Sequence, residues 1–210
     1  MEFLKVALAH LLAVASPGPD FAMVLRQSLT HGHRTAVWTA IGVGSAICLH
    51  VTYSLLGIGV LLANSPLAFT VLKFAAAGYL AWVGIHDLRA KPRQAPSGAA
   101  AGAGPVPPRT PSARAAWMSG FAVNALNPKA GLFFVALFAA VISPKTPKLI
   151  QAGYGVWVSL ATMAWFCLVA YVFTRDRVRR AFLSHGHWID RALGAVFLLL
   201  AASLAFASLR

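Results

Sequence analysis

The chain has 210 residues, of which 59% are hydrophobic and 11% are charged, and its formal net charge is +13. Because a soluble domain carries about 45–50% apolar and about 25% charged residues, this composition excludes an ordinary soluble protein and indicates an integral membrane protein. Most basic residues lie in short connections between apolar runs, as in cytoplasmic loops of membrane proteins. We therefore expect the lipid bilayer, and no nucleic acid, as a partner.

The apolar runs predict an all-α, polytopic membrane protein with six transmembrane helices. A span needs about 20 apolar residues, because the hydrocarbon layer is about 30 Å thick. Ala13-Val14-Ala15 resembles a signal-peptidase site, but the apolar run resumes at Phe21, so we expect an uncleaved first span. The six predicted spans are Phe3–Leu25, Ala36–Leu62, Leu67–Leu88, Ala115–Ile142, Leu149–Thr174 and Ile189–Leu209.

The first span is interrupted by Ser16-Pro17-Gly18-Pro19-Asp20. Each proline removes a backbone donor and clashes with a preceding carbonyl, and Gly18 adds conformational freedom, so we expect a broken helix and not only a kink. Asp20 is the only carboxylate that the predicted spans place well inside the membrane, where a charge costs about 2.5–3.5 kcal/mol on insertion scales. A cost of this size indicates a function for Asp20.

Other polar side chains lie within the first three predicted spans. Lys73 is about two turns into the third span, where its ammonium either extends toward the membrane interface or faces the helix bundle. His10 and His50 lie in the first and second spans, where a lone histidine is more often a hydrogen-bonded packing residue than a proton relay. These three residues are therefore weaker site candidates than Asp20.

Residues 90–114 form the only long connection and are rich in Pro, Ala and Gly. Such a composition cannot pack a core, so we predict a disordered cytoplasmic linker. The linker divides a single transmembrane transporter domain, 1–210, into three-helix repeats at 1–89 and 115–210.

The fourth span has a matching interruption, with Asn124 followed by Asn127-Pro128-Lys129. Pro128 breaks or kinks the helix, and Lys129 places a cation beside the break. Two interpretations remain open. In the first, Asp20 and Lys129 neutralise each other as a buried ion pair. In the second, the two breaks form a site for substrate and proton, where new helix N-termini hold a carboxylate and Asp20 holds an ammonium or a proton. The two can coexist if the pair opens when a ligand enters.

The three-span halves predict an inverted repeat, because an odd number of spans starts the second half on the other side of the membrane. One gap-free shift aligns Pro17 with Pro128 and Gly44 with Gly155. Lys and Arg residues after the first, third and fifth spans outnumber those on the opposite side. The positive-inside rule then predicts a multi-pass protein of the cytoplasmic membrane, with the linker inside and both termini in the periplasm.

The sequence resembles the lysine exporter and homoserine/threonine exporter (LysE/RhtB) family in both halves. The matching motifs are Ser16-Pro17-Gly18-Pro19-Asp20; Gly120-Phe121 with Asn124, Asn127-Pro128-Lys129-Ala130 and Phe133-Phe134; and Lys73 with Gly78-Tyr79-Leu80 and Gly84. The resemblance implies six spans, inverted repeats, dimers and amino-acid efflux driven by the proton gradient. The linker, unusually rich in Pro, Ala and Gly, departs from the family pattern.

The sequence thus predicts a secondary active exporter of amino acids or related small metabolites. An exporter of a metal or another ion with the same architecture is the alternative, although the spans offer only Asp20 and scattered histidines as metal ligands. An enzyme using Asp20 and Lys129 as acid and base is not expected, since the sequence contains no HExxH or GxSxG motif. No cofactor is expected.

Overall fold

The computed structural model describes residues 1–91, 110–143, 145–173 and 175–206, which contain eight α-helices and no strands. The helices are α1 (Glu2–Ala15), α2 (Pro19–His31), α3 (His33–Asn64), α4 (Pro66–Leu88), α5 (Ala113–Ala125), α6 (Pro128–Val141), α7 (Lys148–Val172) and α8 (Asp176–Phe206). The all-α prediction is confirmed for these residues. The predicted disorder of the linker falls largely on 92–109, outside the described residues.

Among the described residues, three helices are each long and apolar enough to cross a membrane, over His33–Leu56, Lys148–Val172 and Ser184–Phe206. The pairs α1–α2 and α5–α6 pass the same test as single broken spans, bent by 52° and 59°, which gives up to five spans. The predicted third span forms α4, whose apolar sequence is interrupted by charged residues at Lys73 and Asp87. The helices therefore break where predicted, while six membrane crossings remain a prediction.

Proline begins the second helix of each bent pair. Gly18 precedes α2 in an extended conformation, and Pro19 takes the first helical position. In the other pair, Asn127 precedes Pro128, and its side chain accepts a hydrogen bond from the N–H of Lys129 at 3.0 Å. Proline suits this position because it has no N–H to leave unpaired and its fixed φ is helical. The proline of each break is therefore also the first residue of the helix that follows it.

The last helix differs from the predicted span, since α8 begins at Asp176 and not near Ile189. Its first turns carry Arg177, Arg180 and two histidines, so their composition resembled that of a loop. The polar side chains are compatible with a helix that continues beyond the apolar stretch. Helix formation and membrane spanning are thus separate properties of this segment.

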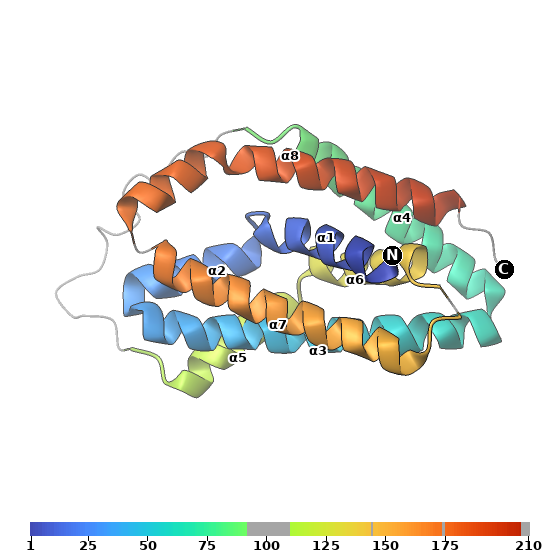
Figure 1. Cartoon of the computed structure of the whole chain (residues 1–210), viewed down its shortest axis with the longest axis horizontal. Helices are drawn as coiled ribbons and strands as arrows, with labels where there is room; N and C mark the ends of the chain where they lie inside the picture. The colour runs from blue at the N-terminus through green and yellow to red at the C-terminus, as the bar shows by residue number, and fades with distance from the viewer. Residues whose placement is uncertain (92–109, 144, 174, 207–210) are drawn as a thin grey trace.

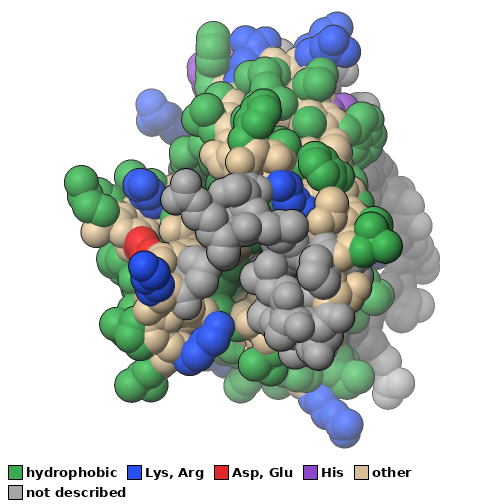
Figure 2. Space-filling model, turned by 90° about the vertical axis from the view of Figure 1, so that its right-hand side faces the viewer, with side chains coloured by type: hydrophobic (Ala, Val, Ile, Leu, Met, Phe, Trp, Pro, Cys, Tyr) green, Lys and Arg blue, Asp and Glu red, His purple; other side chains and the backbone are tan. Residues whose placement is uncertain are grey.

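Figure 1 shows that successive passes of the chain alternate in direction along the long axis. The connections α2–α3 and α7–α8 lie at its left-hand end, and the connections α3–α4 and α6–α7 lie at its right-hand end, where α8 also ends. Figure 2 views the molecule from the right-hand end, where hydrophobic side chains cover much of the flanks and Lys and Arg side chains lie near the edge. This distribution is typical of a protein surrounded by lipid.

The helices form two groups joined by α1 and α6 (Figure 1). In one group α3 packs along α2, α5 and α7; in the other α4 packs along α8, and we call this pair the α4–α8 arm. Both groups contain close helix crossings at glycine. A Cβ on Gly120 of α5 would lie 2.0 Å from the carbonyl oxygen of Thr39 on α3, and a Cβ on Gly84 of α4 would lie 2.9 Å from that of Gly194 on α8.

Candidate functional site

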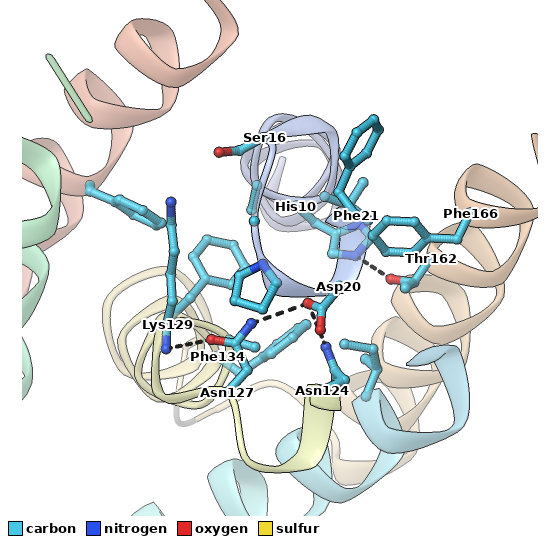
Figure 3. A pocket seen from close by; sticks show the side chains of 18 residues that line it. His10, Ser16, Asp20, Phe21, Asn124, Asn127, Lys129, Phe134, Thr162 and Phe166 are labelled. Atoms are coloured by element: carbon cyan, nitrogen blue, oxygen red, sulfur yellow. Dashed lines mark hydrogen bonds between the residues drawn. The ribbon is translucent and has the colours of Figure 1, made fainter. Parts of the chain in front are cut away.

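A cavity of about 70 Å³ lies where the two broken helices meet, with α7 and α8 completing its wall (Figure 3). Its polar lining residues are His10, Ser16, Asp20, Asn124, Asn127, Lys129 and Thr162. They come from α1, α2, α5, α6 and α7 and from both breaks. Distant parts of the sequence therefore supply a single polar site.

Asp20 is held at the cavity by two amides from the other half of the chain. Its Oδ2 accepts hydrogen bonds from Nδ2 of Asn124 at 3.0 Å and Nδ2 of Asn127 at 3.2 Å. Figure 3 shows both bonds converging on the carboxylate. Its other oxygen, Oδ1, is buried without a hydrogen-bond partner among the described residues. An ionised carboxylate accepts only, so half of its accepting capacity is available to a cation or a proton.

Two further buried polar atoms at the cavity also lack partners among the described residues. Asn124 is only 2% exposed, and its Oδ1 accepts no bond. His10 forms a 2.9 Å bond between Nε2 and the Thr162 hydroxyl, while its Nδ1 has no partner. Because buried polar groups are nearly always hydrogen-bonded, several unsatisfied ones around one cavity indicate a place for a polar ligand or water.

Aromatic rings form much of the remaining wall, from Phe21, Phe133, Phe134, Phe166 and Phe197. An apolar wall with a few converging polar groups is the usual character of a small-molecule site. The cavity volume of 70 Å³ has room for only a few water molecules, whereas ligand pockets commonly have about 300 Å³ or more. The site must therefore widen before an amino acid can enter.

Lys129 is paired with Asp87 of α4 and not with Asp20. Its Nζ lies 2.7 Å from Asp87 Oδ2, and the Asp87 side chain is 9% exposed. The ammonium also lies 5.3 Å from the centre of the Phe197 ring, a favourable cation–π distance. The first of the two interpretations, a buried ion pair between Asp20 and Lys129, is thus not what the structure contains, because each of the two groups has other partners.

A third carboxylate contacts the first break from the α4–α8 arm. The hydroxyl of Ser16 donates to Oδ1 of Asp190 at 2.8 Å, and Asp190 is 2% exposed. Sequence reasoning missed both Asp87 and Asp190 because they lie at span ends beside the basic residues Arg89 and Arg191, where charges usually meet solvent. The sequence around Asp87 or Asp190 does not show that each meets a polar side chain of another helix.

Most of the predicted site residues come together, but not all. Ser16, Gly18, Pro19, Asp20, Asn124, Asn127 and Lys129 line the cavity. Pro17 lies in the first break without lining it, and Pro128 lines a second cavity on the other side of the second break. Lys73 lines neither; it is buried on α4 with its Nζ 5.1 Å from the centre of the Phe74 ring. Within the described ranges, no group of three or more His, Cys, Asp or Glu residues could hold a metal ion.

Comparisons with known proteins extend over nearly the whole chain. Residues 11–208 match the family described as LysE type translocator. The threonine efflux protein of Escherichia coli strain K12 is 28% identical over 197 residues, covering 94% of each chain. The homoserine/homoserine lactone efflux protein of Salmonella typhimurium is 31% identical over 207 residues, covering 95% of this chain and 94% of the relative. No solved structure matches the chain significantly.

Proposed function

Because the chain belongs to the family of LysE type translocators, we propose that it is a secondary active exporter of amino acids or closely related metabolites, driven by the proton gradient. The family consists of membrane transporters and not enzymes, and the named relatives are amino-acid efflux proteins. The observation that carries the proposal is the carboxylate of Asp20, held between two broken helices with one buried oxygen available.

The polar groups of the site match the two charged ends of an α-amino acid. An ammonium needs acceptors, which Asp20 Oδ1 and Asn124 Oδ1 supply. A carboxylate needs donors or positive potential, which the first turn of α2 and the nearby Lys129 supply. Because α2 begins at the cavity without a side-chain cap, its N-terminus favours an anion there. One zwitterion can thus satisfy groups from both halves of the chain.

The rest of the wall favours a small, neutral, hydroxylated side chain. His10 Nδ1 is available for a hydrogen bond, and the Thr162 hydroxyl lies beside the same ring. The surrounding phenylalanines disfavour a second charge. The two relatives are named for threonine and homoserine, which are both hydroxylated amino acids. We therefore expect this substrate class before lysine or glutamate.

Coupling follows if substrate and proton occupy the protein in turn. The charged carboxylate of Asp20 attracts the substrate ammonium, and a proton that neutralises this carboxylate, or adds positive charge beside it, weakens that attraction. Proton uptake from the periplasm then releases substrate on that side. Loss of the proton to the cytoplasm restores affinity for the next substrate molecule.

We also propose that the chain forms a six-span inverted repeat in the cytoplasmic membrane, with both termini in the periplasm. Each half has a bent helix pair followed by two further helices, and corresponding helices run in opposite directions in Figure 1. The end with the connections α2–α3 and α7–α8 includes Arg34, Arg175 and Arg177, which the positive-inside rule assigns to the cytoplasm. Opposed repeats around a central site are typical of secondary transporters.

A substrate panel in proteoliposomes tests the proposed function. The purified full chain is reconstituted, and exchange of radiolabelled threonine, homoserine, lysine and glutamate is measured with and without a pH gradient. We expect exchange of threonine or homoserine, and accumulation only when the gradient is imposed. Absence of exchange for every amino acid, together with flux of a divalent metal ion, would instead support the metal-export alternative.

A further inference from the structure

A second, larger cavity lies on the other side of the α5–α6 break from Asp20. Its volume is about 460 Å³, and it is lined by residues of α3, α4, α5 and α6, including His50, Tyr53 and Gly131. Asn127 lines both cavities. Asn127 in the break therefore lies between a small cavity at Asp20 and a larger one at His50.

The two ring nitrogens of His50 connect this break to the second cavity. Nε2 lies 3.0 Å from the backbone oxygen of Asn124, and Nδ1 lies 2.7 Å from the hydroxyl of Tyr53. A carbonyl only accepts, so Nε2 carries the hydrogen; neutral Nδ1 then accepts from the Tyr53 hydroxyl. His50 is 1% exposed, whereas Tyr53 is 40% exposed. The tyrosine is thus the accessible end of the pair.

A continuous set of hydrogen-bonded groups leads from the second cavity to the proposed substrate site. Tyr53 bonds His50, His50 bonds the backbone of Asn124, and the amide of Asn124 bonds Asp20. The Asn124 carbonyl belongs to the last turn of α5, and the C-terminus of a helix favours a positive charge. In a protonated His50 both nitrogens would donate, Nε2 to the Asn124 carbonyl and Nδ1 to the oxygen of Tyr53, so each N–H has an acceptor.

The charged and titratable groups that face His50 among the described residues are few. Tyr53 is on the same helix, and the carboxylate of Asp20 on α2 acts on the imidazole electrostatically. From α6, the ring of Phe134 stacks on it at 6.1 Å between centroids and carries no charge. From α5 it meets the backbone carbonyl and the side-chain amide of Asn124, neither of which is charged. A charge gained by His50 is therefore felt mainly by Asp20.

We propose that His50 is the acceptor of the coupling proton and that this proton arrives from the second cavity past Tyr53. A proton from water in that cavity adds to Nδ1 as the Tyr53 hydroxyl turns to accept the new N–H, and the water is left as hydroxide that bulk solvent neutralises. The imidazolium places a positive charge next to the Asp20 site and so weakens its hold on the substrate ammonium. This inference rests on the proposed function and identifies where its proton binds.

The position of the pair agrees with the proposed direction of proton flow. Tyr53 follows His50 along α3 toward the α3–α4 connection, at the end of the molecule where α8 also ends (Figure 1). We propose that this end faces the periplasm, from which the proton gradient drives protons inward. The second cavity would then be the entry for protons, and the small cavity would hold the substrate.

Gly131 of α6 provides a test that substitutes neither His50 nor Tyr53. A Cβ at this position would lie 2.6 Å from the Tyr53 hydroxyl oxygen and 3.6 Å from His50 Nδ1. Gly131→Ala therefore forces the hydroxyl away from the imidazole. Gly153→Ala is the matched control, because a Cβ at Gly153 meets nothing within 4 Å among the described residues.

The experiment compares the full-length parent, Gly131→Ala, Tyr53→Phe, His50→Gln and Gly153→Ala in proteoliposomes. Threonine exchange without a gradient is measured beside threonine accumulation under an imposed pH gradient, with a pH dye inside the vesicles reporting proton flux. We expect the ratio of accumulation to exchange to fall about tenfold in the first three variants, a size typical of coupling between two sites, and to stay at the parent value in Gly153→Ala.

Normal coupling in both Gly131→Ala and Tyr53→Phe would overturn the inference, whatever the fate of the His50 variant. That outcome, with parental exchange intact, would leave the proposed function standing. Absence of threonine and homoserine exchange in the parent itself would instead contradict the proposed substrate class, and the proton role of His50 with it.

Discussion

Lys129 forms its ion pair with Asp87, at 2.7 Å between Nζ and Oδ2. The pair connects the second helix break to the α4–α8 arm, and the bond from Ser16 to Asp190 connects the first break to the same arm. Asp20 is therefore left with two neutral amide donors and no cation among its bonded partners in the described residues. The charge of Asp20 remains available for a ligand.

Removing the cation of this pair is expected to destabilise the protein more than removing both charges. Among the described residues, Lys129→Met leaves the buried carboxylate of Asp87 with only the 3.4 Å contact to His86 Nδ1, and loss of one partner of a buried ion pair costs about 3–5 kcal/mol in soluble proteins. Lys129→Met/Asp87→Asn leaves no such charge and should recover most of the loss. Thermal unfolding midpoints in detergent measure the effect. Equal midpoints for the single and double variants would contradict the pairing.

The bond between Ser16 and Asp190 predicts a different response to two substitutions at one position. Asp190→Asn keeps an Oδ1 acceptor for the Ser16 hydroxyl, whereas Asp190→Ala removes it and leaves that buried hydroxyl without this partner. Loss of one partner of a buried hydrogen bond costs about 1–3 kcal/mol. The alanine variant should therefore unfold at a lower temperature than the asparagine variant. If the two unfold together, the bond does not hold α8 to the first break.

Helix packing at Gly120 is expected to tolerate no added methyl group. A Cβ there would lie 2.0 Å from a backbone oxygen of α3, so α5 must shift in Gly120→Ala. Overpacking of this kind costs about 1–3 kcal/mol. Gly153→Ala, which adds the same group in open space, is the control. Unfolding midpoints should fall only for the first variant, and a fall in both would point to an effect of glycine itself.

The sequence predicted the two breaks and the residues around Asp20 because prolines inside apolar spans act locally, through missing donors and fixed φ. It did not predict the partners of Lys129 and Ser16, since these depend on how α4 and α8 pack. Lys73 illustrates the same limit. It is buried as a residue facing the bundle would be, but it lines neither cavity. The sequence therefore predicts features that depend on neighbouring residues, such as the helix breaks, but not which side chains of different helices meet.

A lone histidine within a span favours a packing role, and the hydrogen bonds of His50 alone would fit that interpretation. The connection of His50 to the substrate site runs through Asn124, which lies far away in the sequence and bonds both His50 and Asp20. No spacing within the second span carries this information. Only a known contact between His50 in the first half and Asn124 in the second could have predicted this role.

Membrane orientation can be tested independently of transport. The excess of basic residues after α2, α4 and α7 predicts that the C-terminus is periplasmic. A reporter that is active only in the periplasm should work when fused to the C-terminus and fail when inserted at Gly102. The reverse pattern would invert the orientation and, with it, the side from which protons enter the second cavity.

The central claim is that the carboxylate of Asp20 holds the amino group of the substrate. Asp20→Asn retains the size of the side chain but removes the charge, so we expect normal membrane insertion. The most direct measurement is exchange of radiolabelled threonine and homoserine in proteoliposomes, for Asp20→Asn beside Asp190→Asn, which also replaces a buried carboxylate by an amide but lies outside the cavity lining. We expect Asp20→Asn to abolish exchange of both amino acids, whereas Asp190→Asn retains it. Near-parental exchange by a folded Asp20→Asn protein would contradict the role of Asp20.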